Sequence, residues 1–216
     1  MNIIIFGHPG AGKGTQSDNL VKDLNLFKVS TGDLLREEIK KESFLGVKIK
    51  SIIDQGNFVP DELVYDLVKK ILSNIDYFNR LVFDGYPRNL NQSKNLDILL
   101  KEYNQKISCV FNLKVNRQIV VKRILGRQVC SKCGLIFNKY FNPENKINHS
   151  CGSVFLQKRS DDYEKTVEKR LTTYDKETSP VLDYYKNQNL LHEIEGEMKI
   201  DEIYKEIRNI IGSLDA

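Results

Sequence analysis

The feature that most constrains this chain is a glycine-rich turn directly after an apolar run. Residues 3–6 are Ile-Ile-Ile-Phe, and residues 7–15 are Gly-His-Pro-Gly-Ala-Gly-Lys-Gly-Thr. Glycine tolerates positive φ angles and lets the backbone approach a ligand closely. The amide groups of such a turn converge on phosphate oxygens at the start of the following helix. The sequence therefore predicts a buried strand followed by a phosphate-binding loop, or P-loop.

The end of this turn indicates which phosphates it binds. Lys13 supplies a point charge for β- and γ-phosphates, and a hydroxyl just beyond it can face Mg²⁺. Ser or Thr usually follows the lysine directly, whereas here Gly14 follows it and the hydroxyl comes at Thr15. The alternative is an ordinary glycine turn between a strand and a helix, which the preceding strand and the lysine together disfavour.

Composition and charge narrow the class of protein. Of the 216 residues, 40% are hydrophobic and 29% are charged, as is typical of a soluble globular protein. The net charge of +4 suits a protein that handles polyanions, but no Lys/Arg block predicts a nucleic-acid-binding arm. No run approaches the roughly 18 apolar residues of a membrane helix, and no signal peptide is recognisable. We therefore expect a cytoplasmic protein, and a monomer by default.

Apolar runs alternate with helical stretches along the chain. Strands are expected at residues 3–6, 27–29, 81–84, 108–113 and 190–194, and helices at 14–24, 31–41, 45–55, 61–74, 91–104, 117–127, 164–187 and 201–214. This alternation predicts an α/β fold in which helices cover both faces of a central parallel sheet. Ligands of such sheets bind beyond the carboxyl ends of the strands.

Two segments depart from the alternation. Residues 30–59 form a helical insertion after the second strand. Residues 126–163 are rich in cysteine, asparagine and turn formers, which predicts a small insertion of short antiparallel strands.

A second motif follows the strand at residues 81–84. Asp84 ends the strand, and Gly85, Tyr86, Pro87 and Arg88 form the turn after it. An aspartate in this position beside a P-loop typically holds Mg²⁺, often through water. Pro87 stiffens the turn, and the planar guanidinium of Arg88 suits a phosphate.

A weaker signal precedes the helix at residues 31–41. Ser30 or Thr31 can cap that helix, and Arg36 lies about one turn further along, where it could reach a second phosphate.

Together these residues resemble adenylate kinase, of the P-loop nucleoside monophosphate kinase family and the bacterial long-lid type. The resemblance spans the chain through residues 7–16, 30–33, 59–62, 84–88 and 159–162. The family carries Gly-Lys-Gly-Thr in this turn, which accounts for Gly14 between the lysine and the hydroxyl of Thr15. The resemblance implies reversible, Mg²⁺-dependent transfer of the ATP γ-phosphoryl group to AMP, giving two ADP. It also implies an AMP-binding domain (residues 30–59), a lid domain (126–163) and a core P-loop domain (1–29, 60–125 and 164–216).

The resemblance assigns site residues by position. Catalysis is expected from Lys13, Arg88, Arg123, Arg159 and Arg170. ATP is expected at Gly10, Ala11, Gly12, Lys13, Gly14, Thr15, Arg127, Ile136, Phe137 and Met198. AMP is expected at Thr31, Arg36, Asn57, Phe58, Val59, Gly85, Tyr86, Pro87, Arg88, Gln92, Arg159 and Arg170. Mg²⁺ is expected to be held through water by Thr15 and Asp84.

Physical chemistry agrees with this assignment. Phosphoryl transfer needs in-line positioning and cancellation of charge more than it needs a protein nucleophile. Two nucleotides bring many negative charges together, which converging cations must stabilise. Water must also be excluded, so the two insertions are expected to close as lids over the substrates.

Other functions remain as alternatives. Gln92 looks like the side chain that reads adenine, and related UMP/CMP kinases tend to carry Asn there, so Gln92 and the long lid favour AMP. The donor base is read largely by backbone, so GTP is not excluded. An alternative of another class is a P-loop module with a zinc ribbon that binds nucleic acid. The modest charge and the lack of a basic stripe with interleaved aromatics disfavour it.

Clustered cysteines in the 126–163 segment predict a metal site. Cys130 and Cys133 form a C-x-x-C knuckle, and Cys151 follows a polar loop. Three thiolates and the imidazole of His149 can complete tetrahedral zinc. Many bacterial relatives carry C-x-x-C followed later by a second pair, C-x-x-C or C-x-x-D. Aligning Cys151 with the fourth ligand of that pattern puts Asn148, a poor zinc ligand, at the third position. His149, one residue along, is the better candidate. The alternatives are a decayed site or a lid held by hydrogen bonds. A small β-rich insertion lacks a core, so we expect structural zinc.

Cys109 lies in an apolar run and is expected in the core. His8 and His192 have no partner that the sequence reveals, and we interpret both as incidental.

Overall fold

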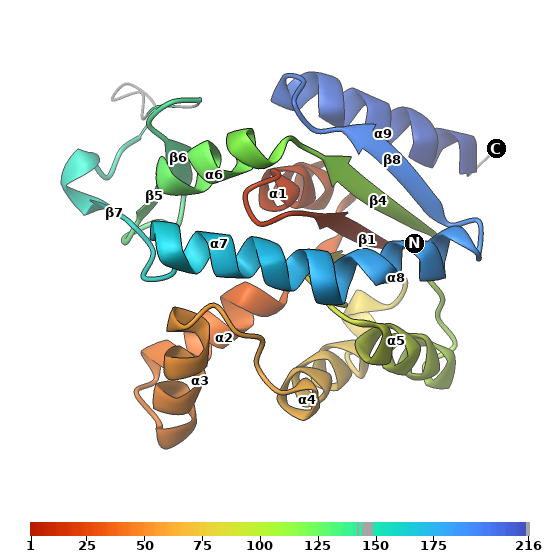
Figure 1. Cartoon of the computed structure of the whole chain (residues 1–216). Helices are drawn as coiled ribbons and strands as arrows, with labels where there is room; N and C mark the ends of the chain where they lie inside the picture. The colour runs from red at the N-terminus through yellow and green to blue at the C-terminus, as the bar shows by residue number, and fades with distance from the viewer. Residues whose placement is uncertain (142, 144–148, 215–216) are drawn as a thin grey trace.

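The centre of the protein is a parallel sheet. A computed structural model describes residues 1–141, 143 and 149–214. Five strands lie in the order β2-β3-β1-β4-β8, and Figure 1 shows β1, β4 and β8 side by side in it. Their bounds are β1 (Asn2–Gly7), β2 (Phe27–Ser30), β3 (Leu81–Asp84), β4 (Cys109–Lys114) and β8 (Leu191–Glu195). All the pairings are parallel, as the alternation of strands and helices predicts.

Helices cover both faces because the strand side chains alternate between them. Ile3 and Ile5 pack with α1 (Lys13–Leu24) and α9 (Ile200–Leu214). Ile4 and Phe6 belong to the opposite cluster, with α4 (Asp61–Leu72), α5 (Leu90–Glu102) and α8 (Ser179–Lys186). With both faces covered, the central strands β1, β3 and β4 are mostly apolar, and the predicted three-layer α/β fold is confirmed.

The segment after β2 is helical, as expected. It contains α2 (Thr31–Lys40) and α3 (Phe44–Asp54), which lie below the sheet in Figure 1. Ser30 is the N-cap of α2, and its hydroxyl accepts a hydrogen bond from the Asp33 amide. A short 3₁₀ turn (Ile75–Tyr77) follows α4.

A second, smaller sheet lies between α6 (Arg117–Leu125) and α7 (Glu164–Thr173). Its strands are β5 (Arg127–Cys130), β6 (Ile136–Asn138) and β7 (Leu156–Gln157), preceded by a 3₁₀ turn (Ser153–Phe155). The order is β6-β5-β7 and both pairings are antiparallel. Figure 1 shows this sheet at the edge of the molecule, away from the central strands. The expected short antiparallel strands are confirmed.

Most helix boundaries lie within two residues of the sequence-based expectation, and two differences affect the region around the P-loop and the small sheet. The helix expected at residues 164–187 is divided by a π-helical turn (Tyr174–Thr178) between α7 and α8. Pro180, at the start of α8, has no N–H to donate to the preceding turn. The helix expected to reach residue 127 ends at Leu125, and Arg127 begins β5. Among the described residues, no helix has both the length and the apolar character needed to cross a membrane.

Candidate active site

The P-loop connects the carboxyl end of β1 to the start of α1. Gly10 and Gly12 have φ angles of 84° and 104°, in the left-handed region that favours glycine. A Cβ at Gly10 would lie 2.7 Å from Ile124 Cγ1, so the loop also needs glycine there for space. The loop therefore has the backbone form that places amide groups at the N-terminus of α1.

Lys13 folds back over this loop. Its Nζ donates to the carbonyl oxygens of Gly7 at 2.8 Å and His8 at 3.0 Å. Burial lowers its pKa from 10.5 to about 8; nearby Asp84 opposes this shift, whereas the positive charge of Arg88 adds to it. A desolvated ammonium held by neutral carbonyls gains strongly from an incoming phosphate.

Strand register brings Asp84 to the same edge of the sheet. Asp84 pairs with Ile5 on one side and with Ser30 on the other. Its Oδ2 lies 3.4 Å from the position of a Cβ added to Gly14, next to Thr15 in the first turn of α1. A carboxylate and a hydroxyl at this edge are suitable oxygen donors for Mg²⁺ or its bound waters.

A cavity opens beside the P-loop and brings together residues from distant parts of the chain. It is lined by Lys13 and by Arg36, Asn57, Phe58, Val59, Gly85, Pro87, Arg88, Asp161 and Arg170, among others. A narrower cavity continues from it, lined by Thr31, Leu35, Phe58, Val59, Val64, Tyr86, Arg88 and Gln92. The candidate AMP residues thus line two adjoining cavities, with the exception of Arg159.

Arg88 is the central cation of the larger cavity. Its Nε donates to Gly85 O at 2.7 Å, and its guanidinium lies 5.1 Å from the centre of the Phe58 ring. Burial, together with the neighbouring positive charges of Arg170 and Arg36, lowers its pKa to about 10. These three arginines repel one another in a partly desolvated space, which favours the entry of an anion.

Two consecutive aspartates hold the arginines that approach from the other side. Asp162 is ion-paired with Arg127, and Asp161 Oδ2 lies 2.7 Å from Arg170 Nη1. Burial acts to lower the pKa of Arg127, but hydrogen bonds and charge from Asp162 raise it overall. Burial, together with the positive charges of Arg127 and Arg36, lowers the pKa of Arg159 to about 10. Arg159 therefore lies within electrostatic range of both Arg127 and Arg36.

Some sequence-predicted residues lie outside the two cavities. Arg123 Nη1 donates to Ala11 O at 3.2 Å and to Gly196 O at 3.0 Å, on another side of the P-loop. Met198 is half-buried and packs with the cluster of α1 and α9. Ile136 and Phe137 are on β6 of the small sheet, where Phe137 packs against His149 with ring centres 4.8 Å apart.

Sequence reasoning missed several supporting residues. The interpretation of His8 as incidental is wrong, because its Nε2 lies 2.7 Å from Asp175 Oδ1 and its ring packs on Tyr174. The Gly7 amide donates to the Tyr174 hydroxyl at 3.1 Å. The π-helical turn places Tyr174 and Asp175 against the P-loop, and no local pattern in the sequence indicates such a turn. The Asp161-Asp162 pair, by contrast, was visible as part of the 159–162 motif.

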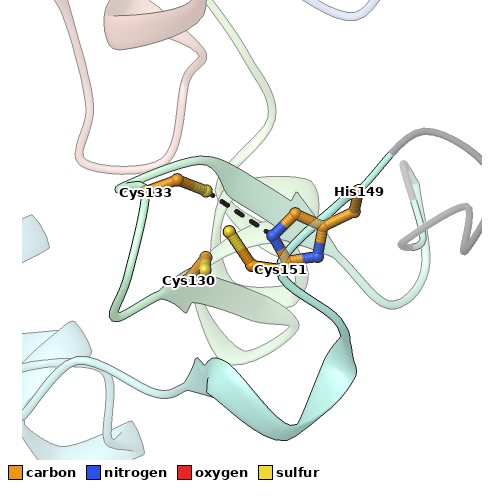
Figure 2. A group of neighbouring side chains, drawn as sticks. All are labelled: Cys130, Cys133, His149 and Cys151. Atoms are coloured by element: carbon orange, nitrogen blue, oxygen red, sulfur yellow. Dashed lines mark hydrogen bonds between the residues drawn. The ribbon is translucent and has the colours of Figure 1, made fainter.

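The cysteine cluster forms in the small sheet. The ligand atoms of Cys130, Cys133, His149 and Cys151 all lie within 4.8 Å of one another, and Figure 2 shows them turned toward a common centre. Cys133 Sγ lies 3.5 Å from His149 Nε2. A zinc tetrahedron with bonds of about 2.3 Å needs donor atoms roughly 4 Å apart, so the four residues fit zinc. Asn148 lies outside the described residues.

Comparison with known proteins gives the family. A family model described as adenylate kinase matches residues 5–190. An adenylate kinase of Pelagibacter ubique (strain HTCC1062) is 47% identical over 98% of this chain and 99% of its own length. Those of Methanocella arvoryzae and Enterococcus faecalis are 42% and 40% identical, covering 99% and 98% of this chain and 100% and 99% of their own lengths. The chain therefore belongs to the adenylate kinase family and is an ATP:AMP phosphotransferase.

Proposed function

We propose that this enzyme binds ATP at the P-loop and AMP in the two adjoining cavities, with their phosphates meeting at Lys13 and Arg88. The observation that carries the proposal is the convergence of basic side chains on this space. Arg88 and Arg170 are close enough to lower the pKa of Lys13, and Arg170 and Arg36 are close enough to lower that of Arg88. Such mutual repulsion is costly in the protein alone and becomes favourable when phosphates enter.

The two substrates take different parts of the site. The amides of residues 10–15 and Lys13 serve the ATP phosphates, and Arg36 and Arg88 serve the AMP phosphate. Thr31, Asn57, Phe58, Val59, Tyr86 and Gln92 surround the AMP nucleoside. Arg123, Arg127, Arg159 and Arg170 stabilise the group in transfer. Placement of the ATP base at Ile136, Phe137 and Met198 stays a prediction from the resemblance.

The aspartates beside these arginines have a preparatory role. Asp161 and Asp162 hold Arg170 and Arg127 in place before substrates arrive, so the guanidinium groups need little reorganisation. Their charge also offsets part of the repulsion among the cations. During the reaction, Arg170 and Arg127 would each contact a substrate phosphate while staying paired with the aspartate.

Asp84 and Thr15 would hold Mg²⁺, through its bound water. The fit rests on the register that sets Asp84 beside Gly14 at the P-loop. When bound with ATP, the ion neutralises negative charge on the β- and γ-phosphates. Asp84 and Thr15 would orient the ion and take no covalent part in the phosphoryl transfer.

Cys130, Cys133, His149 and Cys151 would hold a structural zinc ion. Four protein donors leave no open position for a substrate, so the ion's contribution is to folding of the small sheet. We further propose that residues 30–59 and 126–163 move as an AMP-binding domain and a lid, against a core of residues 1–29, 60–125 and 164–216. Their closure would exclude water from the cleft.

The substrates are ATP, AMP and ADP. A monomer, a cytoplasmic location and the absence of nucleic-acid or membrane partners stay predictions from the sequence.

A structure with a bisubstrate analogue, two adenosines joined by a phosphate chain, tests the proposal. We expect Arg36 and Arg88 to contact the chain at its AMP end and Lys13 at its ATP end. Arginines that point into solvent, away from the second adenosine, would overturn the assignment. A coupled assay that replaces ATP with GTP, and AMP with UMP or CMP, tests donor and acceptor preference in the same preparation.

A further inference from the structure

The narrower cavity has one polar side chain whose orientation is determined from outside the cavity. Gln92, in the first turn of α5, is 3% exposed and lines this cavity. Its Nε2 donates to Asp61 Oδ1 at 2.6 Å, and its Oε1 accepts from the Arg88 amide at 2.8 Å. Asp61 is the first residue of α4 and does not line the cavity.

These two contacts determine which way the amide of Gln92 faces. An ionised carboxylate only accepts hydrogen bonds, so the nitrogen of Gln92 must face Asp61. A backbone N–H only donates, so the oxygen must face Arg88. Reversal of the amide would set oxygen against carboxylate and N–H against N–H. The chemistry of the neighbours therefore fixes the orientation.

Asp61 is itself held in place. Its Oδ1 and Oδ2 accept from Asn89 Nδ2 at 3.1 and 3.2 Å, and Oδ2 accepts from Asn91 Nδ2 at 3.0 Å. Asn89 is the N-cap of α5, and its Oδ1 accepts from the Gln92 amide at 2.8 Å. The start of α4 and the start of α5 are thus joined through one carboxylate, which leaves it little freedom to turn away.

The fixed amide has one donor and one acceptor position left. The second N–H of Nε2 and the second lone pair of Oε1 are the remaining hydrogen-bonding groups. Adenine presents an acceptor at N1 and a donor at its 6-amino group, which complement them. A 6-oxopurine such as hypoxanthine or guanine presents N1–H and O6, so donor would face donor and acceptor would face acceptor.

We propose that Asp61 is a specificity-determining positioning residue, which selects 6-aminopurine over 6-oxopurine monophosphates by fixing the amide orientation of Gln92. This inference rests on the proposed function, in which Gln92 faces the AMP base. The Asp61 contact is charge-assisted and the Arg88 contact is between neutral groups, so Asp61 carries the larger share of the orienting free energy. Without Asp61 the amide can reverse and accept a 6-oxopurine.

The test compares AMP with IMP as phosphoryl acceptors in the full-length enzyme. In Asp61→Ser the hydroxyl suits a helix start but is too short to reach Gln92. We expect KM for AMP to rise about tenfold, kcat to change less than about twofold, and the AMP/IMP ratio of kcat/KM to fall about tenfold. Asp61→Asn keeps the shape but can donate as well as accept, so it should also lower the ratio, by less than Asp61→Ser does. Glu62→Ala, which removes the same charge from the same helical turn at an exposed position, should match the parent.

Other results decide against the proposal. An unchanged AMP/IMP ratio in Asp61→Ser, or an equal fall in Glu62→Ala, overturns it. If Asp61→Ser does not fold, Asp61→Asn must still lower the ratio, because its amide can face either end of Gln92, and an unchanged ratio there overturns the proposal. Gln92→Leu distinguishes failure of the proposed AMP site from failure of the orienting role of Asp61. If it leaves the KM for AMP and the ratio unchanged, the AMP site is wrongly placed; if it alters both while Asp61→Ser does not, only the orienting role fails.

Discussion

The two sheets of this protein are held together by different means. In the parallel sheet, Ile4, Phe83 and Phe111 are fully buried between helices. In the region of the small sheet, Leu135 and Val154 are 53% and 82% exposed, whereas Cys130 and His149 are buried among the metal-ligand candidates. Hydrophobic burial stabilises the first sheet, and four donor atoms arranged around one point would stabilise the second.

This difference predicts that activity and stability can be changed separately. Lys13→Ala should lower kcat by at least about 1000-fold, because it removes a charge that faces the transferred phosphoryl group. The melting temperature should stay close to that of the parent, since the cost of burying the ammonium offsets its hydrogen bonds to Gly7 and His8. Steady-state kinetics and calorimetry measure the two effects. Lys22→Ala, exposed in the last turn of the same helix, is the matched control. A Lys13→Ala enzyme as active as the parent would contradict the phosphate-binding role.

The parallel sheet should respond strongly to loss of a buried ring. Phe83→Ala is expected to reduce the free energy of unfolding by about 3–4 kcal/mol, through lost burial and the cavity left behind. Val154→Ala in the small sheet region should cost less than about 0.5 kcal/mol, because that side chain is largely exposed. Urea unfolding of both variants gives the comparison. Similar losses in the two would show that the sheets do not differ in the way described.

The stability of the small sheet should depend on bound metal rather than on a buried ring. Purified protein should contain about one zinc per chain, and Cys133→Ser or a strong chelator should remove it. We expect hydrogen exchange at residues 127–138 to accelerate while the parallel sheet keeps its protection. Activity should fall roughly tenfold, since Arg127 at the start of β5 and Arg159 after β7 lose their support. A metal-free protein with a fully protected small sheet would refute this part of the comparison.

The contact between the two regions should depend on pH. Asp161 is buried, and although burial acts to raise its pKa, the charges of Arg170 and Arg127 hold the pKa below 3.8. Its stabilising contribution is therefore complete above about pH 4 and is lost as the pH falls through the lower, folded-state pKa. Asp161→Asn should cost about 1–2 kcal/mol at pH 7. The gap to the parent should narrow as the pH falls below 4, as measured by urea unfolding; a constant gap would argue against the ion pair.

Local signals in the sequence predicted the framework of the fold well. The strand and helix positions follow from apolar periodicity, and the P-loop follows from glycines that the positive φ angles require. The cysteine spacing predicted a cluster that the structure assembles, with His149 in place of the family's usual third ligand. The exceptions, such as the π-helical turn at Tyr174–Thr178, arise where tertiary contacts override the local helical pattern.

The sequence by itself determined which chemistry is present: a phosphate-binding loop, an aspartate after a buried strand, basic residues in family motifs, and four zinc-type ligands. Each depends on neighbours within a few positions. Only the tertiary structure decided the long-range contacts that hold these groups in place. Contacts such as Asp61 with Gln92 and His8 with Asp175 join residues far apart in the chain. They depend on strand order and on which helix face packs against the sheet, because those choices set long-range distances that no local pattern encodes.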